Sequence, residues 1–155
     1  LKQAGLKKYQ EVWHTVPRYL HIQPCLVLIY ADYLIQEKNT HQAEMLLREA
    51  LKKNWDEYLL LKYCEVKDNS AKQLANAEHW LRTHADDANL LYVLGQLSIA
   101  NELWGKARSY FEESLAIKPS SRSYQALAAL LETIEDTKEA IKYYRQALLY
   151  CREEK

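Results

Sequence analysis

Histidine and cysteine are the side chains of this 155-residue sequence with the widest chemistry, because they bind metals and act as nucleophiles or bases. The chain has five histidines and three cysteines, which are His14, His21, His41, His79, His84, Cys25, Cys64 and Cys151. There is no C-x-x-C pair. His79 and His84 stand five residues apart, about 140° around a helix, and cannot hold one metal together. We therefore expect no metal site, and the odd number of well-separated cysteines favours buried, reduced thiols.

The sequence also lacks the motifs of the common catalytic sites. No H-E-x-x-H, G-x-S-x-G, phosphate-loop or calcium-loop pattern is present. Only three glycines and three prolines are available for the turns that such sites need. The carboxylates stand singly or in pairs such as Glu112 and Glu113, as on a solvated helix face. We therefore expect no enzymatic activity and no catalytic residue.

The composition excludes further classes of protein. The 21 lysines and arginines balance the 21 aspartates and glutamates, whereas a general nucleic-acid-binding protein needs an excess of positive charge. The mean hydropathy of −0.47 and the lack of a long apolar run exclude a membrane span within these residues. Because the chain begins at Leu1 and not at a methionine, we interpret it as part of a longer protein.

An internal repeat supplies the elements that must position any functional residue. It is marked by four alanines at intervals of 34, 30 and 33 residues, namely Ala43, Ala77, Ala107 and Ala140. A bulky residue follows each of them by four positions, as Phe111 follows Ala107, and Leu94 and Gly95 occupy large and small positions in the preceding helix. Small residues let two helices approach closely, and large ones fill the space between them. This pattern is typical of the tetratricopeptide repeat and predicts an all-α, right-handed solenoid of stacked antiparallel helix pairs.

Hydrophobic periodicity and capping residues predict nine helices and no strand. The helices are expected at residues 4–16, 24–38, 41–53, 57–67, 71–84, 87–101, 104–118, 121–134 and 137–153. They would form a single domain over 1–155, with a leading helix in 1–20 from a preceding unit and repeats at about 24–57, 58–87, 88–120 and 121–154. Glu65 at a small-residue position predicts a shorter or distorted second repeat, whose second helix begins with a capping box of Ser70 and Gln73.

The first helix of each repeat is expected to line the concave face, where such solenoids bind their partners. The candidate partner-binding residues on this face are Lys62, Tyr92, Gln96, Arg122 and Gln125. A surface of apolar groups, amides and few charges suits an extended or helical peptide. Other tetratricopeptide proteins hold acidic C-terminal tails with a lysine and an asparagine where this chain has Leu28 and Asp32, so we do not expect that binding mode.

Three segments are more specific than the repeat pattern. They are LREALKKNWD (47–56), AEHWLRTHADDANLLYVLGQL (77–97) and LWGKARSYFEESLAIKP (103–119), and Trp13 and Pro17 precede YADYLI (30–35). Together they resemble the C-terminal part of the HemY-type tetratricopeptide proteins of Gram-negative bacteria. The resemblance implies a bacterial inner-membrane protein with two N-terminal transmembrane helices outside this chain, associated with a late step of protoheme biosynthesis. It implies no catalytic activity and no mapped functional residue.

We therefore interpret the chain as a non-catalytic scaffold that binds a protein or peptide, and the resemblance implies that its partners are haem-synthesis enzymes. The resemblance and the unpaired cysteines favour the cytoplasmic side of the inner membrane, with membrane contact only through an N-terminal region outside this chain. We expect no nucleic-acid partner and no cofactor. Two alternatives stay open: a haem or porphyrin carrier that uses His21 or Cys25, and a self-assembly module whose repeats pack end to end.

Overall fold

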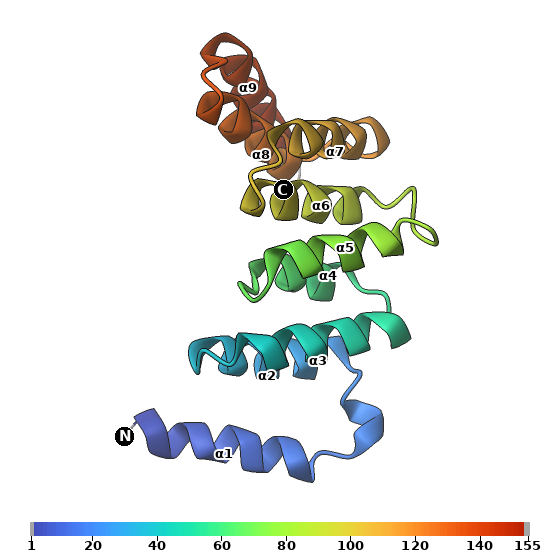
Figure 1. Cartoon of the computed structure of the whole chain (residues 1–155), viewed down its shortest axis with the longest axis vertical. Coiled ribbons are helices and arrows are strands. Elements are labelled where there is room, and N and C mark those ends of the chain that lie inside the picture. The colour runs from blue at the N-terminus through green and yellow to red at the C-terminus, as the bar shows by residue number, and fades with distance from the viewer. Residues whose placement is uncertain (1, 154–155) are drawn as a thin grey trace. The chain divides into compact units, whose positions relative to one another are not determined.

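The computed structural model describes the backbone of residues 2–153 and the side chains of residues 8–152. Every regular element in that range is helical (Figure 1). The elements are α1 (Lys2–Thr15), the short 3₁₀ helix η1 (Arg18–Leu20), α2 (Pro24–Gln36), α3 (Thr40–Lys53), α4 (Glu57–Glu65), α5 (Ser70–Trp80), α6 (Ala88–Ala100), α7 (Trp104–Ile117), α8 (Ser121–Thr133) and α9 (Thr137–Glu153). The predicted α-helices are thus confirmed, with small differences at their ends, and η1 is an addition too short to show periodicity.

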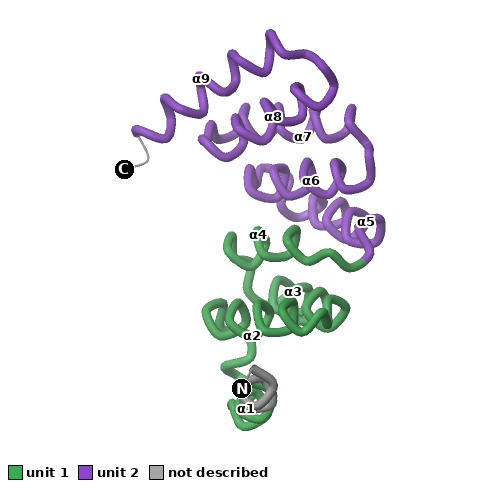
Figure 2. The backbone as a smooth tube through the Cα atoms, turned by 90° about the vertical axis from the view of Figure 1, so that its left-hand side faces the viewer, with its two compact units in different colours: residues 1–68 green, residues 69–155 purple. Residues whose placement is uncertain are grey.

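The chain forms two compact units that divide between Asp68 and Asn69 (Figure 2). Unit 1 contains α1 to α4, and unit 2 contains α5 to α9. The division falls between α4 and α5, which are the two helices expected to form the second repeat, 58–87. Helix α4 has only nine residues and ends at the exposed Glu65, in agreement with the expected shortening. The single domain and the four repeat boundaries stay predictions.

Helix α5 ends earlier than predicted, at Trp80 instead of residue 84. The amide of Arg82 donates to the carbonyl of His79, and that of Thr83 to the carbonyl of Trp80, at 3.3 and 3.1 Å. These bonds span three residues and not four, so they tighten the chain into a turn. Local periodicity does not reveal such a change of hydrogen-bond register.

The start of α5 also differs from the expected capping box. Asn69 is the N-cap, and its side-chain oxygen accepts a hydrogen bond from the Lys72 amide at 3.0 Å. Ser70 donates instead to the Asn101 side-chain oxygen at 3.2 Å, and Gln73 is buried. Asparagine caps helices as well as serine does, so the helix begins one residue earlier than the pattern suggested.

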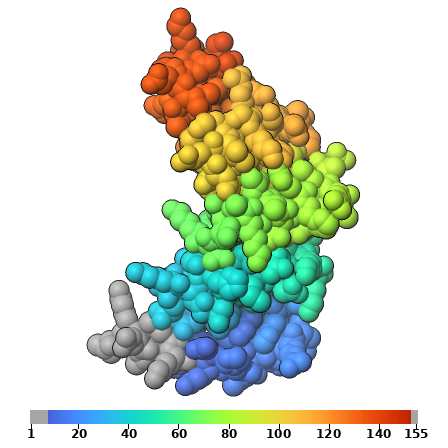
Figure 3. All heavy atoms as spheres, viewed as in Figure 1, coloured from blue at the N-terminus to red at the C-terminus, as the bar shows by residue number. Residues whose placement is uncertain are grey.

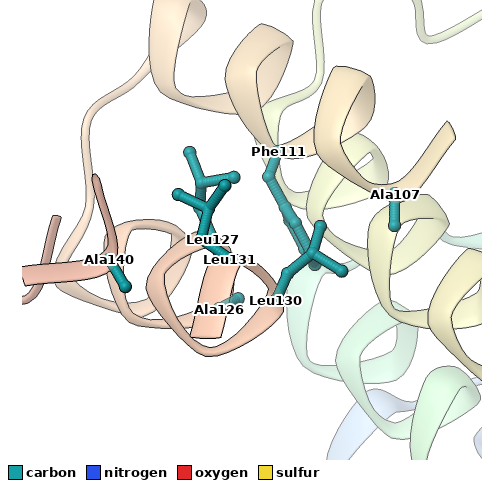
Figure 4. Close-up of a cluster of buried hydrophobic side chains, with 7 residues drawn as sticks. All are labelled: Ala107, Phe111, Ala126, Leu127, Leu130, Leu131 and Ala140. Atoms are coloured by element: carbon teal, nitrogen blue, oxygen red, sulfur yellow. The ribbon is translucent and has the colours of Figure 1, made fainter. Parts of the chain in front are cut away.

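Two helices of unit 2 approach each other closely at Gly95, as expected. A Cβ atom there would lie 2.6 Å from Cδ1 and 2.7 Å from Cζ of Phe111, and closer still to Cε1. Phe111 projects from α7 toward Leu127 and Leu130 of α8, and all three side chains are buried (Figure 4). The small residue on α6 thus makes room for the large one on α7, as the repeat pattern predicted.

Unit 1 combines an apolar core with a buried polar cluster. Val27 of α2 packs in the core with Ala43 and Leu47 of α3, and all three are fully buried. The buried carboxylate of Glu44 accepts hydrogen bonds at its Oε1 from Tyr63 Oη at 2.9 Å and from Arg48 Nε at 3.1 Å. This cluster joins α3 to α4. Side chains of successive helices fill the space between the ribbons within each unit (Figure 3).

The three cysteines are free thiols, and their burial corrects the expectation. Cys25 and Cys151 are exposed, because they lie in the first turn of α2 and the last turns of α9, on sides that no helix of their own unit covers. Cys64 is half-buried and donates to the Leu61 carbonyl at 3.1 Å. No helix in the described part of the chain is both long and apolar enough to cross a bilayer.

Helices α5 and α7 are joined at Glu78. Its Oε1 accepts hydrogen bonds from Lys106 Nζ at 2.8 Å and from Tyr110 Oη at 3.1 Å. Burial first, and then the charge and hydrogen bond of Glu78, raise the pKa of Tyr110 from 10.0 to about 12. The folded state therefore keeps the Tyr110 proton at a pH where the unfolded chain has lost it.

We expect the free energy of unfolding to fall as the pH rises from about 10 to about 12, because the folded state then binds more protons than the unfolded state. The Tyr110→Phe variant should lose less stability over this range than the wild type. Urea unfolding at pH 9 and pH 11 measures the difference. The Glu78→Gln variant should lower the pKa of Tyr110 in an NMR titration with ζ-carbon-labelled tyrosine. Identical pH dependence of the wild type and Tyr110→Phe would contradict this account.

Candidate partner-binding face

Two helices of unit 2 position four of the five candidate residues. Tyr92 and Gln96 lie one turn apart on α6, and Arg122 and Gln125 lie three residues apart on α8, so each pair shares one side of its helix. We call these four residues the Tyr92 face.

Side-chain caps fix where both helices of this face begin. The Asp87 carboxylate accepts hydrogen bonds from the amides of Asn89 and Leu90 at 2.8 and 3.2 Å, at the start of α6. The Ser120 hydroxyl accepts one from the Ser123 amide at 3.1 Å, at the start of α8. Since a cap sets the register of the first turn, it also sets which side chains lie on the face one turn later.

Tyr92 is the centre of this face. The Arg122 guanidinium carbon lies 5.5 Å from the centroid of the Tyr92 ring, and Gln96 Nε2 donates to Tyr92 Oη at 3.1 Å. The inner edge of the ring packs against Phe111, with centroids 5.9 Å apart. Tyr92 is therefore held by the core on one side, while it orients an arginine and an amide at the surface.

The remaining candidates are placed differently. Gln125 is exposed on α8 and shares the side of Arg122, but among the described contacts it does not join the Tyr92–Gln96–Arg122 cluster. Lys62 belongs to unit 1, where its Nζ lies 3.0 Å from Asp32 Oδ1 and 2.6 Å from Glu65 Oε2. The role of all five residues in binding a partner stays a prediction.

The carboxylates of Asp32 and Glu65 raise the pKa of Lys62 and balance its charge. Burial would lower the pKa of Lys62, but the hydrogen bonds and charges of Glu65 and Asp32 outweigh it and raise that pKa above its ordinary value. Lys62 stays charged, and its charge is already matched by two acids. This part of unit 1 therefore has a surplus of negative charge, whereas Arg122 makes the Tyr92 face positive.

Asp32 and Glu65 are residues of this surface that the candidate set did not include. Asp32 lies on α2 and Lys62 on α4. They form an ion pair between the first helices of the first two expected repeats. The repeat register contains a signal for this pair, because Lys62 stands 34 residues after Leu28 and Leu28 lies one turn from Asp32. Only the packing of α2 against α4 shows that the two side chains meet.

An aromatic stack in unit 1 holds His21, one of the two residues considered for a haem carrier. The Trp13 ring lies between the rings of His21 and Tyr30, with both centroid distances at 4.3 Å. His21 Nε2 lies 3.1 Å from the Trp13 carbonyl oxygen and donates to it. A cavity of about 260 Å³ beside His21 is lined by Arg18, Lys53 and Glu49 together with apolar side chains. Within the described residues, no group of three or more His, Cys, Asp or Glu side chains could hold a metal ion.

Comparison with known proteins defines the class of this fold. The sequence pattern of the tetratricopeptide repeat matches residues 121–154. A thermophilic tetratricopeptide protein of Thermus thermophilus superimposes with a TM-score of 0.70 and 16% identity, over 96% of this chain and 82% of that chain. A crystal structure of MamA gives a TM-score of 0.62 and 18% identity, over 96% and 88%. The chain is an all-α tetratricopeptide-repeat solenoid, a fold that serves protein–protein interaction.

The sequence is also similar to named bacterial proteins over nearly its whole length. The chain is 27% identical over 146 residues, or 94% of its length, to protein HemY of Escherichia coli strain K12, and the same values hold for HemY of Shigella flexneri. The chain thus resembles HemY proteins over nearly all of its length, as the three sequence segments indicated. The aligned region covers 36% of the length of these relatives.

Proposed function

We propose that this chain is a non-catalytic scaffold that holds a protein or peptide segment on the Tyr92 face. We further propose that it is the repeat region of a bacterial inner-membrane protein linked to a late step of protoheme biosynthesis. On this proposal its partners are haem-synthesis enzymes and the domain lies on the cytoplasmic side. The similarity to HemY over 94% of the chain supports this context.

The observation that carries the binding proposal is the Tyr92–Gln96–Arg122 cluster. Arg122 is exposed, yet its position over the Tyr92 ring restrains it, and Gln96 is restrained by its bond to Tyr92 Oη. Side chains that are already ordered lose less conformational entropy when a partner binds. The cluster therefore offers a preformed binding surface.

The groups on this face define what it can bind. Arg122 and the amide nitrogen of Gln125 are donors, while the amide oxygen of Gln96 is an acceptor. Extended or helical peptide segments present carbonyl oxygens, carboxylates and amide hydrogens that match these groups. The exposed part of the Tyr92 ring supplies the apolar contact that anchors such segments.

We expect the Tyr92→Ala/Arg122→Glu double variant to lose partner binding while it keeps its helical content. Each change removes part of a central anchor, and such residues typically contribute about 2 kcal/mol or more to an interface. The measurement is affinity capture from a detergent extract of Gram-negative bacterial membranes, with this chain as bait and haem-pathway enzymes identified by mass spectrometry.

A matched control replaces an exposed tyrosine and an exposed cation elsewhere, in Tyr58→Ala/Lys118→Glu. The control should retain the same haem-pathway enzyme as the wild type. Equal retention by the Tyr92→Ala/Arg122→Glu variant would move the binding site away from this face. Capture of no haem-pathway enzyme by the wild type would contradict the proposed partners.

The haem-carrier alternative makes a different prediction. It requires a saturable, stoichiometric shift of the haem absorption spectrum that is lost in His21→Ala or Cys25→Ala. The cavity beside His21, at about 260 Å³, is smaller than the roughly 300–1,000 Å³ of typical ligand pockets, which supports the scaffold over the carrier. The self-assembly alternative requires a mass that rises with concentration in light scattering.

A further inference from the structure

The outward side of α9, the last helix of unit 2, is unusually apolar for an exposed surface. Helix α9 packs against α8 (Figure 1), and the buried Ala140 and Ala147 lie in that contact. On other sides of the helix Leu148 is 71% exposed, Leu149 54% and Ile141 49%. Large exposed apolar side chains that gather on one part of a surface mark interaction sites.

Cations share this side of α9 with the apolar residues. At 100° per residue, six side chains fall within about 100° of the helix circumference. We call them the α9 basic face: Ile141, Leu148, Leu149, Lys138, Arg145 and Arg152. The acid of this helix with a described side chain, Glu139, lies about 130° from the centre of the face and 3.5 Å from Arg108.

An open hollow lies beside the α9 basic face. This hollow of about 660 Å³ is lined by Arg145, Leu148, Leu149, Cys151 and Arg152. Leucine and arginine side chains line it together, so it matches apolar side chains that are accompanied by carboxylates.

We propose that the α9 basic face binds an acidic amphipathic helix of a partner protein. Leucine-like side chains of that helix would enter the hollow, and its carboxylates would lie opposite Lys138, Arg145 and Arg152. The pairing buries the exposed leucines and satisfies the three cations together. This site is separate from the Tyr92 face and does not depend on the proposed function.

The end helices α1 and α9 of a second copy have the wrong charge to be the occupant. Two α9 helices packed face to face would place Arg145 and Arg152 opposite the same cations. The leading helix α1 is basic as well, since Lys7 and Lys8 outnumber Glu11 in its central part. Like charges brought together across an interface cost binding energy.

An anionic bilayer fits the pattern of side chains less well than a helix does. Interfacial membrane helices have a continuous apolar strip with cations at its edges. On α9 the cations Arg152, Arg145 and Lys138 lie together between Ile141 and Leu149 around the circumference, so they divide the apolar side chains. A partner helix can place carboxylates opposite these cations and apolar side chains beside them.

Three synthetic helices of about 18 residues test the proposal. The first has a leucine stripe flanked by glutamates, the second has the same stripe flanked by lysines, and the third keeps the glutamates but has serines in the stripe. Binding of each labelled helix to the 155-residue chain is measured by fluorescence anisotropy at low and at physiological salt. We expect the first helix to bind at least about tenfold more tightly than the other two, and salt to weaken its binding.

Two double variants and one control make the test specific. Arg145→Glu/Arg152→Glu should reverse the preference, so that the lysine-flanked helix binds more tightly. Leu148→Ser/Leu149→Ser should weaken binding of the glutamate-flanked leucine helix by about tenfold or more. The control Lys72→Glu/Lys118→Glu changes the same net charge at exposed positions of unit 2 and should bind as the wild type does.

Several results would overturn the proposal. Equal affinity for the glutamate-flanked and lysine-flanked helices would show that the charges do not select the partner. Unchanged binding in both α9 variants would place the contact elsewhere. Association through this face with vesicles of phosphatidylglycerol and phosphatidylcholine, with no helix binding, would identify a membrane as the occupant. A mass that rises with concentration and is lost in Leu148→Ser/Leu149→Ser would identify a second copy.

Discussion

Replacing Phe111 by alanine should lower the free energy of unfolding of unit 2 by about 3–5 kcal/mol. Phe111 is fully buried between α6, α7 and α8, where it contacts Gly95 and the ring of Tyr92. Its removal costs the transfer free energy of the ring and leaves a cavity that the helices cannot close without moving. Urea unfolding monitored by circular dichroism measures the loss.

The same contact predicts that substitution by alanine affects stability very differently at two glycines. Gly95→Ala places a methyl group against the Phe111 ring, and overpacking costs about 1–3 kcal/mol, of which the better helix propensity of alanine recovers about 1 kcal/mol. Gly105→Ala, in the first turn of α7, meets nothing within 4 Å and should instead be neutral or stabilising. The Gly95→Ala and Phe111→Leu changes should be less than additive. Equal effects of the two Gly→Ala changes would contradict the close approach.

The Arg48→Met variant should lower the free energy of unfolding of unit 1 by about 3 kcal/mol. Glu44 is only 3% exposed, and its carboxylate accepts hydrogen bonds from Arg48 and from the buried Tyr63. Removal of one partner of a buried ion pair typically costs about 3–5 kcal/mol, because the remaining charge stays away from water. Arg48 is itself 25% exposed, which places the expected loss at the lower end of that range.

An exposed ion pair on the same helix is the matched control. Lys52 Nζ lies 2.8 Å from Glu49 Oε1, and both side chains are more than half exposed. Lys52→Met should therefore change stability by about 1 kcal/mol or less. Glu44→Gln combined with Arg48→Met should restore most of the lost stability, because an amide still accepts from Tyr63 and carries no charge. A loss from Arg48→Met no larger than that from Lys52→Met would show that the buried cluster is not stabilising.

The sequence alone predicted the class of fold and the course of the helices, because both depend on local spacing. Alanines at intervals near 34 residues and large residues four positions later indicate where paired helices touch. Gly95 and Phe111 show how far this reasoning extends: their types and positions predicted a close contact that the structure contains. The three segments similar to HemY proteins came from the sequence as well.

The sequence did not predict details that depend on competing hydrogen bonds. Asn69 caps α5 although Ser70 fits the motif, because both residue types cap equally well and the tertiary contact of Ser70 with Asn101 selects between them. In the same way, Trp80 ends α5 through bonds that span three residues. Such choices involve small differences in free energy between local alternatives.

For the candidate partner-binding residues too, local spacing predicted some features and only the tertiary structure showed others. Repeat register placed Tyr92, Gln96 and Arg122 on one face, and the structure brings them together. The repeat register did not show that Asp32 and Glu65 balance the charge of Lys62, because that depends on how α2 packs against α4.

For this protein, then, the sequence by itself determined the helices, their pairing pattern and the type of repeat. The tertiary structure decided which charges are matched, which apolar side of α9 is left uncovered by α8, and where the compact units divide. The physical reason is that helix formation and helix pairing follow from residues three to four positions apart. Charge pairing and exposure depend on distances between residues that are remote in the sequence, which only the packed helices fix.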